Sequence, residues 1–250
     1  MNVGIVGYGK MGRQIERILK EKGINVVSII DNFAQDAPFK EVNRASLKGA
    51  DMVIDFASSE DVVERIIEYK NNCVSVVMGT TGWYDDMDKV KEIVENKIGF
   101  IWSGNFSLGV NIFFRVLKYA SSVFNNFPEY DPLSYEIHHK EKKDSPSGTS
   151  LMIGDILKSQ IEKKSKITTE RLDRKIESEE LHIASVRGGY HPGIHSVQFD
   201  SPADTIEFKH TARNREGLAY GAVQAAIWLR DKKGFFNIDD FFDSLIQEIR

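Results

Sequence analysis

In the first hundred residues, segments with the hydrophobic pattern of a strand alternate with segments that have the pattern of a helix. Short runs rich in β-branched residues predict strands, and these runs are Val3–Val6, Asn25–Ile30, Met52–Phe56, Val74–Met78 and Phe100–Trp102. Between several of them, apolar residues recur at spacings of three and four, which predicts helices over Gly12–Lys22, Glu60–Tyr69 and Trp83–Asn96. Strands and helices that alternate at this pace indicate βαβ units and a parallel sheet.

The pattern changes near Gly104. It predicts a helix with a strong apolar face over Asn111–Phe124, then a strand over Leu133–His138, a polar loop, and a helix from Ser147 to Lys163. The charged segment Lys164–Glu180 predicts an exposed connection with some strand. Three further runs predict antiparallel strands of a second sheet, and they are Leu181–Arg187, His195–Asp200 and Thr205–His210.

A final predicted helix, Asn214–Arg230, is rich in alanine. Because small residues suit close packing of a helix on a sheet, we expect this helix to return to the first half of the chain. The whole pattern predicts a nucleotide-binding-type α/β half followed by an α+β half.

Composition narrows the class of protein. A chain of 250 residues, 41% hydrophobic and 28% charged, is typical of a globular protein with one large domain or two modest ones. The 33 Lys+Arg and 37 Asp+Glu give a net charge of -4, without the basic field of a general nucleic-acid binder. No apolar run approaches the ~18 residues of a membrane span, and the N-terminus lacks the pattern of a secretory signal. We therefore expect a cytoplasmic protein that binds neither nucleic acid nor membrane.

A single cysteine excludes an internal disulfide and a cysteine-based zinc site of the usual kind. Cys73 precedes an apolar run, which favours a small core residue over a catalytic one. No cysteine or histidine stands at ligand spacing from His138 and His139, so we expect no metal.

The most familiar local motif is GxGxxG, formed by Gly7-Tyr8-Gly9-Lys10-Met11-Gly12. It directly follows a predicted strand and opens a predicted helix, which is the context of a dinucleotide-binding loop. The first glycine permits a tight turn, the second lets a pyrophosphate approach the backbone, and the third allows close helix–strand packing. The helix start then offers free N–H groups to the anion.

An acidic residue about 20 positions further on is expected to bind the ribose. Asp31 stands there, at the end of the second predicted strand. Its carboxylate would accept hydrogen bonds from the ribose hydroxyls of NAD and repel a 2′-phosphate, although Lys10 and Arg13 could offset that repulsion. We favour NADH, with NADPH also used. A glycine loop and an acidic turn without a ligand would give the same pattern.

Two later segments also follow predicted strands of the parallel sheet. They are Gly79-Thr80-Thr81-Gly82 and Ser103-Gly104-Asn105-Phe106-Ser107. Because ligands of open parallel sheets bind outside the carboxyl ends of the strands, both segments are candidates to contact the nicotinamide half of the cofactor. Ordinary glycine turns are the alternative.

The segment from Glu136 to Thr149 carries the most chemistry. His138 and His139 end a predicted strand, a cationic loop with Lys142 follows, and Ser147-Gly148-Thr149 begins a helix. A helix start with hydroxyls, a lysine and a nearby histidine forms an anion pocket with a proton donor. A solvated, charged loop before a capped helix is the alternative. Adjacent strand residues point to opposite faces, so one histidine could be structural.

Across essentially its whole length the sequence resembles bacterial dihydrodipicolinate reductase, also called 4-hydroxy-tetrahydrodipicolinate reductase. The resemblance is carried by Gly7–Arg13, the Gly79–Gly82 turn, Asn105–Val110, His138-His139 with Lys142, Asp144 and Pro146–Thr149, Val186–Gly189, His195, His210–Ala212 and the Gly221–Leu229 helix. It implies NAD(P)H-dependent reduction of a cyclic unsaturated dicarboxylate in lysine and diaminopimelate biosynthesis.

The resemblance also implies residue roles. His138 and Lys142 match proton donors, and His139, Ser147, Gly148 and Thr149 match the dicarboxylate site. The glycine loop, Asp31, residues 79–81 and residues 103–106 match the cofactor positions. The implied fold is an α/β protein with a Rossmann-like dinucleotide-binding domain, residues 1–106 and 214–250, and an α+β domain, residues 107–213, that binds substrate and assembles a homotetramer.

The sequence departs from the family at two places. Lys140-Glu141 stand where many members have Arg-His, and Asn32 follows the ribose acid where strongly NADPH-using members often have Arg. The second departure supports NADH. Two other functions stay open at this point: another two-domain dehydrogenase, and a non-enzymatic NAD(H) sensor that would not need the histidine–lysine pocket.

Overall fold

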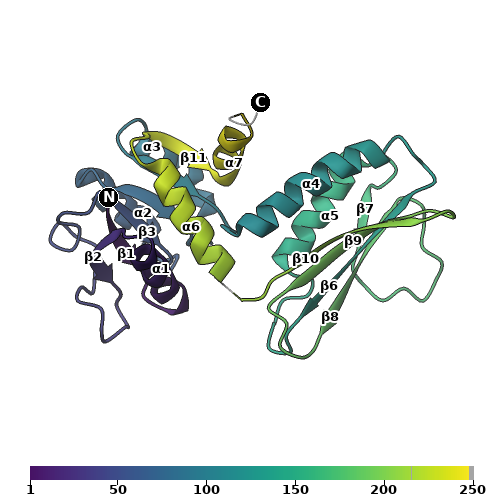
Figure 1. Cartoon of the computed structure of the whole chain (residues 1–250), viewed down its shortest axis with the longest axis horizontal. Helices are drawn as coiled ribbons and strands as arrows, with labels where there is room; N and C mark the ends of the chain where they lie inside the picture. The colour runs from purple at the N-terminus through teal and green to yellow at the C-terminus, as the bar shows by residue number, and fades with distance from the viewer. Residues whose placement is uncertain (215, 248–250) are drawn as a thin grey trace. The chain divides into compact units, whose positions relative to one another are not determined.

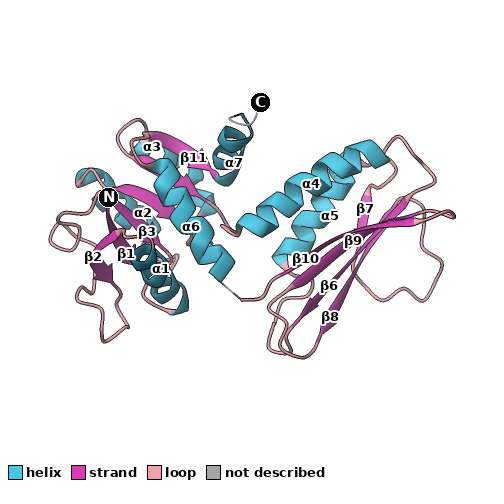
Figure 2. Cartoon of the chain, viewed as in Figure 1, coloured by secondary structure: helices cyan, strands magenta, loops and turns pink. Residues whose placement is uncertain are grey.

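A computed structural model describes residues 1–214 and 216–247. The chain divides into two compact units, each with its own sheet (Figures 1 and 2). Unit 1 comprises Met1–Leu108 and the chain from Glu216 onward, and unit 2 comprises the stretch that begins at Gly109. Among the described residues, no helix has the length and apolar character needed to cross a membrane.

Unit 1 holds a six-stranded parallel sheet in the order β11-β5-β4-β3-β1-β2. Its elements are β1 Asn2–Val6, α1 Lys10–Glu21, β2 Asn25–Ile30, β3 Met52–Asp55, α2 Val62–Asn71, β4 Ser75–Met78, the 3₁₀-helix η1 Tyr84–Asp86, α3 Met87–Val94, β5 Gly99–Trp102, α6 Glu216–Leu229, β11 Gly234–Asn237 and α7 Ile238–Gln247. This confirms the parallel α/β fold expected from the alternating pattern.

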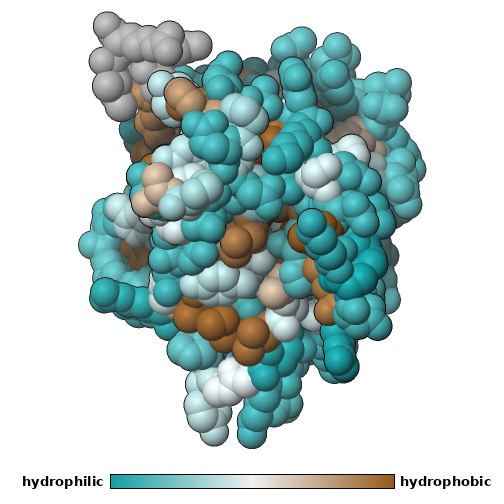
Figure 3. All heavy atoms as spheres, turned by 90° about the vertical axis from the view of Figure 1, so that its right-hand side faces the viewer, coloured by the Kyte–Doolittle hydropathy of each residue, from teal (hydrophilic) through white to brown (hydrophobic). Residues whose placement is uncertain are grey.

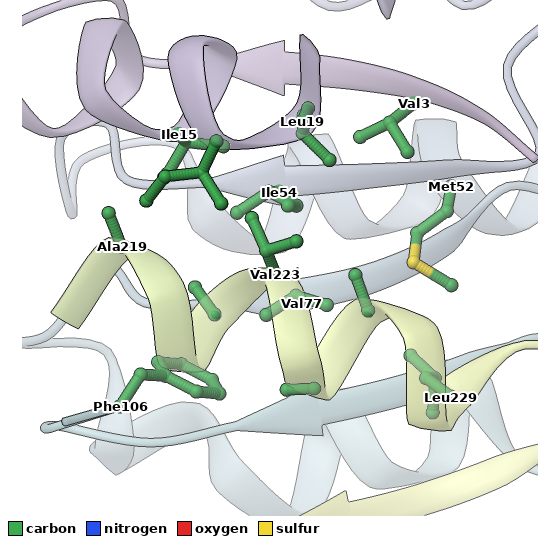
Figure 4. Close-up of a cluster of buried hydrophobic side chains, with 14 of the residues drawn as sticks. Val3, Ile15, Leu19, Met52, Ile54, Val77, Phe106, Ala219, Val223 and Leu229 are labelled. Carbon is green, nitrogen blue, oxygen red and sulfur yellow. The ribbon is translucent and has the colours of Figure 1, made fainter. Parts of the chain in front are cut away.

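The two faces of this sheet bury alternate residues of the same strands. Ile54 joins a core with α1, α6 and α7, whereas its neighbour Val53 joins a second core with α2 and α3. Figure 4 shows side chains of α1 and α6, among them Ile15 and Val223, meeting around Ile54. The strands are buried on both faces, which explains their continuous apolar runs. Helix α6 lies in this unit, where its small residues pack against the sheet.

Unit 2 holds a five-stranded mixed sheet in the order β10-β9-β6-β8-β7. Its elements are α4 Leu108–Phe124, which begins at the last residue of unit 1, β6 Asp131–His138, α5 Gly148–Gln160, β7 Lys166–Thr168, β8 Glu180–Arg187, β9 Ile194–Asp200 and β10 Thr205–Thr211. Helices α4 and α5 cover one face, with Phe114, Leu157 and Phe199 in their shared core.

The prediction that all three later runs are antiparallel is confirmed for β9 and β10 and wrong for β8. Strand β8 pairs in parallel with both β6 and β7, whereas β9 pairs antiparallel with β6 and β10. The connection from β6 to β8 contains α5, and parallel neighbours need a long crossover of that kind.

Three further features differ from the sequence predictions. Strand β11 and helix α7 follow the helix that we expected to be last. Cys73 is exposed and not in the core. It has a positive φ of 57° where the chain leaves α2 for β4, so the buried run begins one residue later, at Val74. A residue in the left-handed region commonly ends a helix.

Candidate active site

The glycine loop lies between β1 and α1. Gly7 has a φ of 86°, and a Cβ there would lie 2.4 Å from the carbonyl oxygen of Phe56. A Cβ on Gly12 would lie 2.1 Å from the carbonyl oxygen of Gly7. By contrast, no atom lies within 4 Å of a Cβ built on Gly9. Packing therefore requires glycine at the first and third positions, and the second leaves open space beside the backbone, as a bound pyrophosphate needs.

The start of α1 is open to an anion. The helix begins at Lys10, and its cap residue, Gly9, has no side chain to satisfy the first N–H groups. Tyr8 is buried and its hydroxyl donates to Glu16, a contact that raises the pKa of Tyr8 to about 12. Lys10 is exposed, and Met11 packs against the core of unit 1. Of the loop's side chains, Lys10 is therefore the one that offers a mobile positive charge.

Asp31 follows β2 beside this loop. Its Oδ2 accepts from the N–H of Tyr8 at 2.6 Å, and its Oδ1 accepts from the N–H groups of Phe33 and Ala34 at 2.7 Å each. Burial works to raise the pKa of Asp31, but the hydrogen bonds from Ala34, Tyr8 and Phe33 outweigh it and hold the pKa below its ordinary value. The carboxylate is thus ionised and fixed, with lone pairs left for further donors.

A cavity of about 490 Å³ lies over this edge of the sheet. Gly7, Gly9 and Asp31 line it together, as the sequence analysis expects of a nucleotide site. Phe33 also lines it and is 91% exposed. Sequence reasoning missed this aromatic residue, although its place two positions after the ribose acid was visible. An exposed aromatic ring beside a nucleotide-sized cavity suits stacking on a base.

The Gly79–Thr81 segment meets a buried network. Gly79 has no room for a side chain, because its Cβ would lie 2.2 Å from the ring of Phe56. Thr80 donates to the carboxylate of Asp55 at 2.9 Å, as do Tyr69 at 2.8 Å and Arg65 Nε at 2.9 Å. Thr81 is exposed. Residues 79–81 lie outside the lining of the 490 Å³ cavity, so their predicted cofactor contact stays a prediction.

The segment after β5 is held by its own hydrogen bonds. Ser103 Oγ donates to the carbonyl oxygen of Asn105 at 2.9 Å and accepts from its N–H at 3.0 Å. Gly104 is exposed at the tip of this turn, and Phe106 is buried in the core of unit 1. The turn is therefore preformed, and the side chain of Phe106 contributes packing. Its role toward the cofactor stays a prediction.

In unit 2 the predicted proton donor lies beside a buried carboxylate. His138 ends β6, is 5% exposed, and places Nδ1 3.2 Å from Glu136 Oε2. Burial lowers the pKa of His138, and the charge of Glu136 works against that shift. His138 is therefore largely uncharged at neutral pH. Its neighbour His139 follows the end of β6 and is half-buried, and its N–H donates to the carbonyl oxygen of His191.

Lys142 lies in the loop after β6. Its Nζ contacts both carboxylate oxygens of Asp144, at 2.8 and 2.9 Å. This ion pair lowers the pKa of Asp144. Arg187 anchors the same loop, because its Nη2 donates to the carbonyl oxygen of Asp144 at 2.6 Å. The lysine is thus held near the site and only partly exposed.

The start of α5 carries the other predicted substrate residues. Ser147 caps the helix, because its Oγ accepts from the N–H of Ser150 at 3.2 Å, and its own N–H donates to Glu136 at 2.9 Å. Nothing lies within 4 Å of a Cβ built on Gly148, and Thr149 is half-exposed. First-turn N–H groups have no acceptor inside their helix. Gly148 and Thr149 therefore present backbone donors at an open surface, whereas Ser147 is occupied by the fold.

His195 joins this cluster from β9. Its ring centroid lies 5.1 Å from that of His138, edge to face, and burial together with the charge of His138 lowers the pKa of His195 to about 4. Glu136, His138 and His195 place ligand-type atoms within 4.8 Å of one another, which is also the donor set of a metal site. Arg187 already lies 2.7 Å from the same carboxylate, so a cation bound there would meet a partly buried guanidinium.

Comparison with known proteins decides the family. Residues 1–106 match the family described as dihydrodipicolinate reductase, N-terminus, and residues 109–242 match dihydrodipicolinate reductase, C-terminus. The chain belongs to the dihydrodipicolinate reductase family. A 4-hydroxy-tetrahydrodipicolinate reductase of Christiangramia forsetii is 36% identical over 99% of this chain and 100% of its own, and one of Archaeoglobus fulgidus is 35% identical over 97% and 100%.

Solved structures agree on the fold. A dipicolinate-bound dihydrodipicolinate reductase from Paenisporosarcina sp. TG-14 matches with a TM-score of 0.77 at 22% identity, over 96% of this chain and 98% of its own. A scyllo-inositol dehydrogenase from Lactobacillus casei with bound NAD(H) matches with a TM-score of 0.53 at 13% identity, over 92% and 87%. These likenesses confirm a Rossmann-like α/β unit followed by a unit with a mixed sheet.

Within this reductase family fold, sequence reasoning missed Glu136, Arg187 and His195 as members of the site. A signal for Glu136 was present, because residues two apart on a strand share a face and His138 had been singled out. The register supplies the other two, since His138 pairs with Arg187 on β8 and Glu136 pairs with His195 on β9. Local sequence carries no sign of these long-range pairings.

Proposed function

We propose that this protein catalyses the NAD(P)H-dependent reduction of 4-hydroxy-tetrahydrodipicolinate to tetrahydrodipicolinate in lysine and diaminopimelate biosynthesis. The observation that carries the proposal is the match of both halves of the chain, at 35–36% identity and full length, to relatives with that name. In the reaction the substrate loses water and gains one hydride and one proton, while NAD(P)H becomes NAD(P)+.

In this proposal unit 1 binds the dinucleotide. When bound, the reduced nicotinamide supplies the hydride. Gly9 leaves space for the pyrophosphate, the start of α1 presents its N–H groups, and Asp31 accepts from the ribose. Residues 79–81 and 103–106 are assigned to the nicotinamide half, because they follow β4 and β5 of the same parallel sheet.

We propose NADH as the favoured cofactor, with NADPH also accepted. Asp31 is ionised and would repel a 2′-phosphate. Arg13 is a candidate to offset that repulsion, but it forms a bidentate ion pair with Asp36, in which each of its two terminal nitrogens donates to one carboxylate oxygen at 2.8 Å. Lys10 and Lys40 are the nearby cations left to meet the extra phosphate.

Unit 2 binds the dicarboxylate in this proposal. Lys142, His139 and the open start of α5 at Gly148 and Thr149 supply positive charge and N–H donors suited to carboxylates. Ser147 supports this site through its cap and its contact with Glu136. Concentrated positive charge also withdraws electrons from the substrate's unsaturated ring, so the ring accepts hydride more readily.

His138 and Lys142 are proposed to manage the proton. His138 is largely uncharged in the free protein, so a bound dicarboxylate would be needed to raise its pKa. The protonated ring then becomes a donor close to neutral pH. Lys142 must leave Asp144 to reach a substrate carboxylate or to donate its own proton.

Assembly as a homotetramer is part of the proposal. The space-filling view of Figure 3 shows hydrophobic patches on a largely hydrophilic surface. On the sheet of unit 2, Leu133, Ile137 and Val186 point to the face opposite α4 and α5, and Leu133 and Val186 are 39% and 49% exposed. An apolar sheet face of this kind suits burial against another copy.

A coupled assay tests the proposed function. Aspartate semialdehyde, pyruvate and the preceding synthase generate the substrate, and oxidation of NADH or NADPH is followed by absorbance. We expect oxidation that depends on every component and is faster with NADH. A sensor would bind NADH without oxidising it and would not bind pyridine-2,6-dicarboxylate, and that pair of results would overturn the proposal.

A further inference from the structure

A buried glutamate lies behind the proposed proton donor. Glu136 is two residues before His138 on β6, so both side chains point to the same face. Glu136 has no exposed surface, and His138 Nδ1 lies 3.2 Å from its Oε2. Within the described part of the chain, no group makes a well-aligned hydrogen bond with that nitrogen. The carboxylate of Glu136 is thus a charged group directly beside it.

Four donors hold Glu136 in its ionised form. Its Oε1 accepts from the N–H of Ser147 at 2.9 Å, from Ser185 Oγ at 2.8 Å and from Arg187 Nη2 at 2.7 Å, and its Oε2 accepts from Ser150 Oγ at 2.8 Å. Burial alone would raise the pKa of Glu136, but these hydrogen bonds reverse the shift and lower the pKa to about 2. The carboxylate is therefore an acceptor only, with no proton to give.

The charge of Glu136 determines which nitrogen of His138 carries the proton. An acceptor beside Nδ1 favours the tautomer with hydrogen on Nδ1 and a free lone pair on Nε2. On the other side of the ring, Nε2 lies 3.0 Å from the position of a Cβ built on Gly193. Glycine at this position therefore leaves open the space that Nε2 faces.

His195 repeats this arrangement through a serine. Ser150 donates its single hydroxyl proton to Glu136, so its oxygen is an acceptor toward His195 Nδ1 at 3.1 Å. His195 thus also carries its proton on Nδ1. Its Nε2 lies 3.7 Å from the same Cβ position on Gly193. Both imidazoles turn their Nε2 lone pairs toward one glycine, and one carboxylate orients both rings.

We propose that Glu136 is a positioning residue of the reductase: it orients His138 so that Nε2 faces the substrate, and it stabilises the imidazolium that forms there. The proposal rests on the proposed function, in which His138 handles the proton. The 3.2 Å contact is expected to align into a charge-assisted hydrogen bond when His138 takes up its proton, since catalytic contacts often tighten only in the complex.

The pH dependence follows from the charges that face His138. These groups are Glu136 on β6, Lys142 and Asp144 in the following loop, Arg187 on β8 and His195 on β9. Lys142, Arg187 and the burial itself lower the pKa of His138, whereas Glu136 and Asp144 raise it. Of the two acids, Glu136 has the larger effect on His138 and is the more buried. Removing its charge must therefore lower the pKa of His138.

The first experiment needs no variant at the glutamate. Histidine ring nitrogens of the ¹⁵N-labelled protein are observed by NMR above pH 7, with His138→Gln and His195→Gln used to assign the signals. We expect both His138 and His195 to show the Nδ1–H tautomer. An Nε2–H tautomer for His138 would overturn the proposal, whether or not the protein proves to be a reductase.

The second experiment uses Glu136→Gln. The glutamine oxygen keeps an acceptor for Arg187, but its amide nitrogen donates toward His138 Nδ1 and moves the ring proton to Nε2. We expect kcat to fall by about 10²–10⁴-fold, the scale of a wrong-tautomer variant, with little change in the KM for NADH. The pH at which kcat/KM declines on the alkaline side should move to lower pH.

Glu180→Gln is the matched control. Glu180 is a buried glutamate on β8 that pairs with Arg174 and Lys166 at 2.7 and 2.8 Å, among neighbours other than the two histidines. Its variant should lose stability and keep the wild-type pH profile. A Glu136→Gln enzyme with wild-type kcat, or with the unshifted profile of Glu180→Gln, would overturn the positioning role. An inactive wild type would instead overturn the proposed function.

Discussion

Both units contain a buried carboxylate near the carboxyl end of a sheet strand, paired with an arginine. Asp55 on β3 accepts from Arg65 at 2.9 Å, and Glu136 on β6 accepts from Arg187 at 2.7 Å. Neither carboxylate has any exposed surface. Hydroxyl donors occupy the remaining lone pairs in both cases, as a buried charge requires.

The two networks differ in what stands next to the carboxylate. The side-chain partners of Asp55 are an arginine, a tyrosine and a threonine, none of which changes charge near neutral pH. Glu136 has His138 at 3.2 Å and His195 at 4.0 Å, whose charges do change. Both networks stabilise a buried carboxylate in the same way. The network of Asp55 is therefore structural, whereas that of Glu136 is coupled to the protonation of histidine. The titratable neighbour makes the difference.

The largest expected effect is on kcat, and it tests whether the network of unit 2 serves the proton donor His138. His138→Gln removes the proposed donor, and we expect kcat to fall by about 10²–10⁴-fold. Binding of NADH, measured by its fluorescence, should stay within about 2-fold, because the glycine loop is in unit 1. Wild-type turnover in this variant would show that His138 is not the proton donor, and the proposed functional difference between the two networks would be wrong.

The next effect tests the unit 1 network as a purely structural one. Asp55→Asn leaves the buried Arg65 without its counter-charge, which should lower the free energy of unfolding by about 3–5 kcal/mol in a urea titration. The exposed pair Arg17–Glu21 is the control, and Glu21→Gln should cost about 0.3–0.5 kcal/mol. Equal stability losses in the two variants would contradict the account.

A smaller effect concerns the acid stability of unit 2. The pKa of His195 is about 4 in the folded protein and near 6.5 in the unfolded chain, so between these values the unfolded chain binds more protons. Stability is therefore lost as pH falls from 6.5 to 4. His195→Gln should make unfolding free energy less dependent on pH in that window. Parallel pH curves for the two proteins would show that His195 does not contribute.

The smallest effect concerns Asp36, a surface carboxylate that pairs with Arg13 on α1, the helix whose start is proposed to bind the cofactor. Asp36→Asn releases Arg13 from an exposed ion pair, which frees the guanidinium for a 2′-phosphate. We expect the KM for NADPH to fall by about 2- to 5-fold, the range of an exposed charge pair, with little change for NADH. Glu92→Gln, on the exposed surface of α3, serves as a control because it makes the same change in net charge. A larger gain for NADH than for NADPH would contradict the proposed selectivity.

Most of the parallel sheet was predictable, because its strands and helices follow from the local spacing of hydrophobic residues. The spacing of Ile15, Ile18 and Leu19 predicts α1, and all three are buried in the structure. The motif GxGxxG could be placed for the same reason. Strand β11 has only four residues, GFFN, and no alternation to reveal it. Local pattern predicts a strand but not its direction, which is why β8 was assigned the wrong pairing.

The candidate site of unit 2 was predictable as a segment of the chain, but its hydrogen-bond network was not. His138, Lys142 and the start of α5 lie within one stretch of chain, whereas Arg187 and His195 reach Glu136 through the register of β8 and β9. The register of two strands depends on which side chains pack beneath the sheet, so it cannot be read from a single sequence. The charge of the histidine could not be foreseen either, because burial sets it.

Inhibition by pyridine-2,6-dicarboxylate tests the central claim most directly, since the account assigns dinucleotide and dicarboxylate to different halves of the chain. In the coupled assay, the inhibitor should compete with the cyclic substrate and not with NADH, and Lys142→Ala should weaken binding of the inhibitor in isothermal titration calorimetry. Competition with NADH, or wild-type affinity of the Lys142→Ala protein for the inhibitor, would contradict the account.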